Sequence, residues 1–398
     1  MSPSWRDLGK IAGSFVEDAQ RLGVWALAGS GPSLHEIAPY RGFGTTSRVL
    51  VQGRAMRARD LAPAGEHDNI VVNLINTYKR VDSNALPHAR VSVRISDVER
   101  EIVTDDEGFF REWIDLATPL VVEGDWHPVH FRLLSPLQST QPDVRASGRI
   151  RIPRPTATFG VISDLDDTVI QSRVANFLQA ARTIMLGNAR TRLPFAGVAA
   201  FYRALECGGD GSQCNPIFYV SSSPWNIHDV ITEFLSLQKI PDGPVMLRDW
   251  DLELSALASS RLKKHKEPLI REILDAYPTL PFVLIGDTSQ QDPEIYREIV
   301  RAYPGRILAI YIRNVDPNPE RLASVQALAK EVLAAGSSLV LADDTAAAAK
   351  HALEHGWITA ENIASVEHEK KADEGKTGTK ADAPGVPNDP GAPTIKVE

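Results

Sequence analysis

The stretch FGVISDLDDT, residues 159–168, decides how the second half of this 398-residue chain folds. Its first four residues form a continuous apolar run, which is typical of a strand buried on both faces of a parallel sheet. Three carboxylates, Asp164, Asp166 and Asp167, follow directly. Ligands bind beyond the carboxyl ends of the strands in open α/β sheets, so this acidic turn is where chemistry is expected.

Other apolar runs end in polar residues of the same kind. One leads into Ser221, Ser222 and Ser223, and another leads into Asp287, with Asp292 shortly after it. Helical patterns separate the runs, so the predicted class is α/β, a doubly wound and mostly parallel sheet. Strands are expected at Phe159–Ser163, Pro216–Ser221, Phe282–Gly286, Arg306–Arg313 and Ser338–Ala342, and helices at Phe195–Leu205, Ile227–Gln238 and Pro268–Tyr277.

Short alternating runs replace the continuous ones in the first half of the chain. Apolar and polar residues alternate in Val91–Ile95 and in Val129–Leu133, as they do in half-buried antiparallel strands. The acids and the glycine of Thr104–Phe110 supply turn chemistry between two strands. A helical spacing over residues 70–78 predicts a helix that interrupts these strands. We expect this part to be a small β-sandwich that precedes the α/β sheet.

These patterns divide the chain into consecutive parts. Residues 1–40 show near-helical spacing of apolar residues and are predicted to form an N-terminal helical segment. Residues 41–150 are assigned to the β-sandwich-like domain, and residues 156–365 to the α/β domain that follows a proline-containing linker. Residues 366–398 contain almost no large apolar side chain, so they cannot offset the entropy of folding and are predicted to be a disordered tail.

The spacing Asp164-x-Asp166 directs two carboxylates into one cavity, because alternate residues of an extended chain share a side. We predict that Asp164 attacks the phosphorus of a substrate as a covalent nucleophile. Asp166 then protonates the leaving oxygen and later deprotonates the water that hydrolyses the aspartyl-phosphate. Carboxylates this close repel each other and the phosphate, so a cation is needed, and Mg²⁺ prefers such oxygen ligands. The predicted metal ligands are Asp164, Asp166, Asp287 and Asp292.

A calcium-binding EF-hand loop also begins with Asp-x-Asp. That loop needs glycine at its sixth position and glutamate at its twelfth, where this chain has Val169 and Ala175. The acidic turn is therefore not an EF-hand.

The oxygens of a transferring phosphoryl group need a hydroxyl or amide donor and a cation. Ser221, which ends an apolar strand, is the predicted catalytic donor, but the choice among residues 221–223 stays open. Lys266 lies nearest an expected helix start and is the predicted catalytic cation, with Lys263 and Lys264 as alternatives. Substrate binding is assigned to Thr168, Ser222 and Arg173.

Charge patterning bears on the partners of the chain. The formal net charge is −8, so no overall positive field draws the protein to nucleic acid or to an anionic membrane. Between Asp167 and Glu206, however, the sequence has arginines and apolar residues but no acid, which would suit a phospholipid headgroup and its chains at a peripheral membrane contact. An amphipathic helix whose arginines balance the catalytic acids gives the same pattern. Without an apolar leader or a long apolar run, a cytoplasmic protein is expected.

The ordered motifs resemble those of the haloacid dehalogenase superfamily. They comprise Asp164-x-Asp166-x-Thr168, Ser221, Lys266, and Gly286-Asp287 with Asp292. Within that superfamily, SDLDDTV at 163–169, YVSSSPW at 219–225, LRDW at 247–250 and IGD at 285–287 look like the actin-patch-associated phosphatidate phosphatase family. The resemblance implies a haloacid dehalogenase-like, Rossmannoid fold and Mg²⁺-dependent removal of phosphate from phosphatidate, yielding diacylglycerol.

The leading hypothesis is therefore a phosphatase that acts on phosphatidate or a related phospholipid. One alternative is a phosphatase of a soluble phosphometabolite or phosphoprotein, which the acidic net charge permits. Another is a non-catalytic module that binds a phosphorylated ligand, which predicts little Mg²⁺-dependent turnover. The sequence does not fix the oligomeric state.

Overall fold

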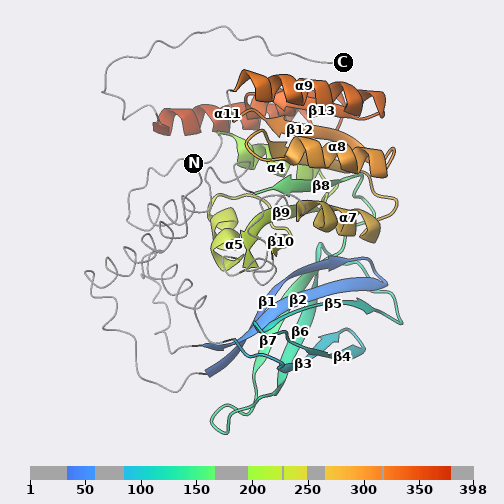
Figure 1. Ribbon diagram of the computed structural model, residues 1–398. Helices are drawn as coiled ribbons and strands as arrows, with labels where there is room; N and C mark the ends of the chain where they lie inside the picture. Colours follow the sequence, from blue (N-terminus) through green and yellow to red (C-terminus); the bar gives the residue numbers. More distant parts are fainter. Residues whose placement is uncertain are drawn as a thin grey trace, which may run out of the picture. The chain divides into compact units, whose positions relative to one another are not determined.

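The computed structural model describes residues 34–58, 85–165, 196–225, 228–248, 265–315 and 318–377. The chain divides into two compact units (Figure 1). The first comprises residues 1–151 and 172–191, and the second comprises residues 152–171 and 192–398. The helix predicted over residues 70–78 lies outside the described residues.

A single seven-stranded sheet makes up the described part of the first unit. Its strands are β1 (Leu34–Gly44), β2 (Arg48–Ala58), β3 (Arg90–Ile95), β4 (Val98–Val103), β5 (Phe109–Asp115), β6 (Trp126–Ser135) and β7 (Arg145–Arg151). The spatial order is β4-β3-β6-β7-β1-β2-β5, and all pairs are antiparallel except β1 with β7. The two outer strands, β4 and β5, approach each other, so the sheet curls into a nearly closed, barrel-like form.

The alternating sequence patterns account for these strands. In β6 the side chains of Val129, Phe131 and Leu133 are buried, whereas His130 and Arg132 between them are exposed, as expected for a strand with one face in the core. The predicted turn before β5 is also present, where Asp105 Oδ1 accepts hydrogen bonds from the backbone N–H groups of Glu107 and Phe109 at 2.9 and 2.8 Å.

The second unit contains an all-parallel six-stranded sheet. Its strands are β8 (Gly160–Asp164), β9 (Ile217–Pro224), β10 (Val245–Arg248), β11 (Phe282–Asp287), β12 (Ile307–Arg313) and β13 (Ser338–Ala342), in the spatial order β10-β9-β8-β11-β12-β13. The central strands β8 and β11 are buried along their whole length, which explains their continuous apolar runs.

Helices pack beside this sheet in two groups. The described helices are α4 (Val198–Cys207), α5 (His228–Leu237), α7 (Lys266–Ala276), α8 (Asp292–Ala302), α9 (Pro319–Ala334), α10 (Thr345–Glu354) and α11 (Ala360–Thr377). Helices α7, α8 and α9 pack against their neighbours in that order, and α4, α10 and α11 pack against one another. Among the described residues, no helix combines the length and apolar character needed to cross a bilayer.

The fold class predicted from the sequence is wrong. The expected β-sandwich is instead one mixed, barrel-like sheet, and the second unit has an all-parallel sheet that does not clearly reproduce a doubly wound, haloacid dehalogenase-like (Rossmannoid) domain. Alternating runs show that one face of each strand is buried, but a sandwich and a curled sheet satisfy that pattern equally well. Continuous apolar runs show that a strand is buried on both faces of its sheet. They do not show on which face of the sheet each connecting segment lies.

Two segments at the ends of the chain also differ from expectation. Residues 34–40, assigned to an N-terminal helical segment, belong to strand β1. Residues 366–377, assigned to a disordered tail, belong to helix α11.

Candidate active site

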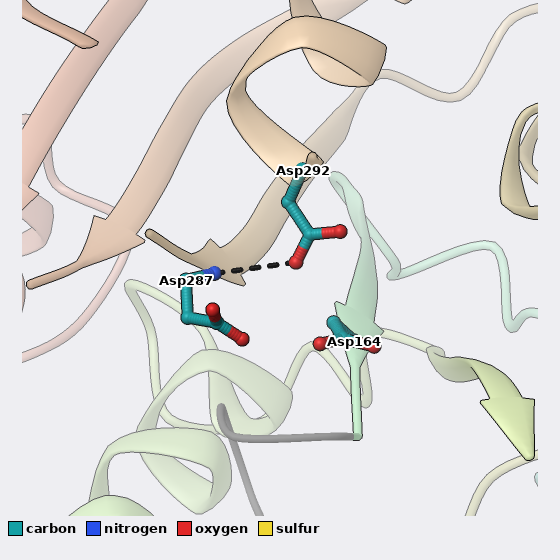
Figure 2. Close-up of side chains that lie close together, drawn as sticks. All are labelled: Asp164, Asp287 and Asp292. Atoms are coloured by element: carbon teal, nitrogen blue, oxygen red, sulfur yellow. Dashed lines mark hydrogen bonds between the residues drawn. The ribbon is translucent and has the colours of Figure 1, made fainter. Parts of the chain in front are cut away.

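Two neighbouring parallel strands carry acidic residues to the same edge of the second sheet. Strands β8 and β11 pair with Ser163 opposite Ile285, so Asp164 and Asp287, which end these strands, lie close together. Figure 2 shows both carboxylates facing a common space. Each residue is at most 1% exposed. The buried strands that precede them hold both carboxylates in a fixed place.

Asp292 reaches the same space from the first turn of helix α8. Its Oδ2 accepts a hydrogen bond from the backbone N–H of Asp287 at 3.2 Å (Figure 2). This close approach depends on Gly286, because a Cβ atom at that position would lie 2.6 Å from Asp292 Oδ2. Pro293 follows at a position that favours a helix start. Gly286, the backbone N–H of Asp287 and the start of helix α8 therefore jointly fix the position of Asp292.

A buried lysine bridges two of the three carboxylates. Lys266, the first residue of α7, is 3% exposed, and its Nζ lies 2.7 Å from Asp164 Oδ1 and 2.7 Å from Asp292 Oδ1. Burial alone would lower the pKa of Lys266, but the two carboxylates raise it well above its usual value. The side chain is therefore a permanent cation at the centre of the site.

The site keeps an excess of negative charge. Ligand oxygens of Asp164, Asp287 and Asp292 all lie within 4.8 Å of one another, and Lys266 supplies a single positive charge. Burial, with the neighbouring Asp292, raises the pKa of Asp287 to about 6. Three carboxylates that offer hard oxygen donors fit Mg²⁺, which prefers such ligands.

The predicted phosphate-binding serines lie on the strand next to Asp164. Val220 of β9 pairs with Asp164, so Ser221 follows one residue further along that strand. Ser221 is fully buried, and its Oγ accepts a hydrogen bond from the backbone N–H of Ser223 at 2.9 Å. Ser222 is half-buried. These positions leave the choice among the three serines open.

The structure brings together four of the predicted site residues, namely Asp164, Lys266, Asp287 and Asp292. Other predicted positions lie outside the described residues; these are Asp166, Thr168, Arg173, Lys263 and Lys264. The catalytic, substrate-binding and metal-binding roles themselves stay predictions.

The sequence reasoning missed a buried hydrogen-bond chain behind Asp164. Ser163 Oγ donates to the backbone oxygen of Asp164 at 2.7 Å and lies 2.5 Å from the hydroxyl of Tyr202. Burial raises the pKa of Tyr202 well above its usual value, so the hydroxyl keeps its proton. Tyr202 lies in the apolar pattern of α4, and nothing in the sequence distinguishes it from a core residue.

Arg313 was also missed, although a signal for it exists. It ends strand β12 and pairs with Asp287 across the sheet. Burial lowers the pKa of Arg313 to about 9, while Tyr202, Asp287 and Asp344 act in the opposite direction. The rule that singled out the ends of the other parallel strands would have found this residue.

Comparison with known proteins bears directly on this segment. Residues 159–314 match the family described as phosphatidate phosphatase APP1, catalytic domain, and they contain Asp164, Lys266, Asp287 and Asp292. The resemblance to a phosphatidate phosphatase family, predicted from the motifs, is confirmed over this segment. The matched APP1 segment begins just before β8 and ends just after β12.

Two curated relatives share this APP1 segment. Phosphatidate phosphatase APP1 of Saccharomyces cerevisiae is 30% identical over 157 residues, which cover 39% of this chain and 26% of the relative. An uncharacterized protein of Schizosaccharomyces pombe is 30% identical over 162 residues, which cover 39% of this chain and 25% of the relative. The aligned part of the chain thus spans about a quarter of the length of these relatives.

Two solved structures show only weak similarity to this chain. A carbohydrate acetylesterase from Xanthomonas citri has a TM-score of 0.24 at 10% identity, over 73% of this chain and 71% of that chain. The PilB minor pilin from Streptococcus sanguinis has a TM-score of 0.24 at 9% identity, over 73% and 88%. Overlaps of this size assign neither a fold nor a function.

Proposed function

We propose that this chain is a Mg²⁺-dependent phosphatase that hydrolyses phosphatidate to diacylglycerol through an aspartyl-phosphate on Asp164. The observation that carries the proposal is the convergence of three buried carboxylates and one buried lysine at the carboxyl edge of a parallel sheet. The choice of phosphatidate is supported by the names of the yeast relative and of the matching family.

The donor set suits a divalent cation. Asp164, Asp287 and Asp292 would hold Mg²⁺, together with Asp166, which is predicted to be a ligand and lies outside the described residues. When bound, Mg²⁺ supplies positive charge that offsets the charge of the phosphoryl oxygens. Lys266 neutralises part of the remaining carboxylate charge through its contacts with Asp164 and Asp292.

The chemical steps use Asp164 and Asp166 in the roles predicted from the sequence. A carboxylate oxygen of Asp164 attacks phosphorus, the bond from phosphorus to the alcohol oxygen breaks, and that oxygen takes a proton from Asp166. Water then attacks the phosphorus of the aspartyl-phosphate while Asp166 accepts the water proton. The bond from phosphorus to the Asp164 oxygen breaks, which releases phosphate and regenerates the Asp164 carboxylate. Lys266 donates to Asp164 Oδ1 and thereby orients the nucleophile. The buried chain of Tyr202 and Ser163 fixes the backbone of the same residue.

Phosphate release from dispersed dioctanoyl phosphatidate, measured with and without Mg²⁺, tests the proposal. Glycerol 3-phosphate and a phosphoserine peptide serve as soluble alternatives. We expect turnover of phosphatidate that requires Mg²⁺ and disappears in Asp164→Asn, because the amide is nearly isosteric but a poor nucleophile. The matched control is Asp275→Asn, since Asp275 lies near the end of α7 and contacts Tyr303.

Three outcomes would each remove part of the proposal. Substantial activity of a folded Asp164→Asn variant would refute the nucleophile. Faster turnover of a soluble phosphate ester would refute the lipid substrate. Binding of phosphorylated ligands without turnover would favour a ligand-binding module.

A further inference from the structure

A small cavity lies beside the candidate active site within the second unit. Its volume is about 40 Å³. The wall is mostly apolar and aromatic, with Phe201 and Tyr202 from α4, Ile285 from β11 and Tyr311 from β12. Arg313 adds a cation to the lining. Asp344 also lines the cavity. A cavity with an apolar wall and a guanidinium group suits a small amphipathic group that carries electronegative oxygens.

Two lining residues of the cavity neighbour the strands that end in Asp164 and Asp287. Arg313 pairs with Asp287 across β11 and β12, so both side chains start from neighbouring points on the same edge of the sheet. Tyr202 contacts Ser163, the residue before the proposed nucleophile Asp164. The cavity therefore lies next to the strand ends that carry Asp164 and Asp287.

The acids near Arg313 already accept other hydrogen bonds. Asp344, which also lines the cavity, has Lys370 Nζ 2.5 Å from its Oδ2, and its Oδ1 accepts a hydrogen bond from Ala347 N at 2.9 Å. Asp287 Oδ1 accepts from the backbone N–H groups of Ser289 and Gln290 at 2.6 and 3.2 Å. A guanidinium group carries five N–H donors, so Arg313 can keep a protein partner and still donate to a ligand.

We propose that this cavity is the subsite for the alcohol part of the substrate, and that Arg313 donates hydrogen bonds to the ester oxygens next to the scissile phosphate. The proposal rests on the proposed function and refines its substrate class. It selects phosphomonoesters of an alcohol that carries acyl ester groups near the phosphate. A cavity of this size admits only a few non-hydrogen atoms, so the acyl chains lie outside it.

Kinetics with two substrates test the role of Arg313. One is dioctanoyl phosphatidate below its micelle concentration, and the other is para-nitrophenyl phosphate, which lacks ester oxygens. Arg313→Gln also changes the surroundings of Asp287, so the ratio of kcat/KM between the substrates is the informative quantity. We expect Arg313→Gln to lower kcat/KM for the lipid about 10- to 100-fold more than for the aryl phosphate, as for the loss of a charge-assisted hydrogen bond. An equal fall for both substrates would overturn the subsite.

Two further variants keep this test decisive. Arg301→Gln, at the exposed end of α8, is the matched control and should leave the ratio unchanged. Arg313→Lys keeps the charge but loses the planar fork, so it should lower the ratio less than Arg313→Gln. If Arg313→Gln fails to fold, an unchanged ratio in folded Arg313→Lys overturns the proposal and a lowered ratio supports it.

A binding measurement separates this proposal from the proposed function. In calorimetric titrations of the full chain with Mg²⁺, the probes are the non-hydrolysable phosphonate analogue of dioctanoyl phosphatidate and methylphosphonate. We expect tighter binding of the lipid phosphonate, and we expect Arg313→Gln to reduce that preference. An absent preference, or one that Arg313→Gln leaves intact, would overturn the subsite. A protein that shows the preference but hydrolyses nothing would refute only the phosphatase activity.

Discussion

Lys266 is the residue on which the charge balance of the site depends. Its ammonium group is buried between the carboxylates of Asp164 and Asp292. Removing one partner from a buried ion pair costs more than the pair itself contributes, because the remaining charge is left without compensation. The lysine therefore stabilises the fold as well as the proposed chemistry.

Replacing Lys266 by an uncharged residue should lower the stability of the protein. We expect Lys266→Met to lower the free energy of unfolding by about 3–5 kcal/mol in the absence of divalent cations. Urea denaturation followed by circular dichroism measures the change. Lys330→Met on the exposed side of α9 is the control and should stay close to the unsubstituted protein. Equal stability of the two variants would contradict the argument.

Gly286 allows a second test at the residue scale. The Cβ atom of Gly286→Ala would lie 2.6 Å from Asp292 Oδ2, so the carboxylate has to move away from the backbone of Asp287. We expect Mg²⁺ affinity to fall about 10- to 100-fold, as when an interaction that orients a metal ligand is lost. Calorimetric titration with Mg²⁺ gives the affinity. Gly124→Ala, where a Cβ meets nothing within 4 Å, is the control. Unchanged affinity in Gly286→Ala would argue against Asp292 as a ligand.

The neighbourhood of Asp164, Asp287 and Asp292 could be predicted from the sequence. Polar residues that directly follow buried strands of a parallel sheet gather at one edge, and each of these acids follows such a run closely. The bridge through Lys266 could not be predicted, because it depends on where α7 begins in space. The contact of Tyr202 with Ser163 could not be predicted either, because an aromatic residue in an amphipathic helix pattern looks the same as an ordinary core residue.

Asp344 caps helix α10 and also forms an ion pair with helix α11. Asp344 accepts a hydrogen bond from the backbone N–H of Ala347 and pairs with Lys370 of α11 at 2.5 Å. The apolar content of α11 is low, so composition alone predicted a disordered tail. Fully buried Val366 and the pair of Glu369 with Arg203 of α4 add the tertiary contacts that composition cannot reveal.

Removing this acid should weaken both helices. We expect Asp344→Ala to lower the free energy of unfolding by about 1–2 kcal/mol at neutral pH, as for the loss of a helix N-cap. Burial raises the pKa of Asp344, but Lys370 and the backbone N–H groups outweigh that effect and leave it below its usual value. The unfolded chain then binds the proton more readily, so this stabilisation is present above the ordinary carboxyl pKa and is lost as the pH falls below it.

Chemical denaturation at neutral and acid pH checks this prediction. The difference between Asp344→Ala and the unsubstituted protein should shrink at acid pH. The control is Asp343→Ala, because Asp343 is an exposed neighbour that accepts a hydrogen bond from Asn314 and is not the N-cap of α10. A difference that grows on acidification would contradict the assigned direction of the pKa.

The two units of the whole molecule should respond differently to a divalent cation. All the candidate ligands lie in the second unit, at the ends of β8 and β11 and at the start of α8. Mg²⁺ should therefore slow hydrogen exchange around residues 287–295, where backbone N–H groups of Ser289 and Gln290 donate to Asp287. Exchange in β1 to β7 should not change. Hydrogen exchange followed by mass spectrometry, with Na⁺ at matched ionic strength as the control, measures both. Uniform protection of both units would contradict a local site.

How the strands assemble into sheets was the feature that could be predicted least from the sequence. Several strands of both sheets were recognisable from local patterns such as Val129–Leu133 and Phe282–Gly286, because burial of one or both faces of a strand shapes its apolar pattern. Residues 34–40 of β1 and strand β10 were not predicted as strands. Whether seven half-buried strands stack as two layers or curl as one sheet depends on pairings between distant strands. The parallel pairing of β1 with β7 is one of these, and no local pattern encodes it.

The curled sheet of the first unit has a consequence for behaviour at high concentration. An open sheet exposes rows of backbone N–H and C=O groups along its margins, and these rows can recruit extended segments from other molecules. Here the margins, β4 and β5, converge on each other, and β4 alternates acidic and basic side chains in the sequence VEREIV. The approach of β4 to β5 and the charged side chains of β4 should both hinder the addition of strands from other molecules. Such strand addition is the first step toward fibrils.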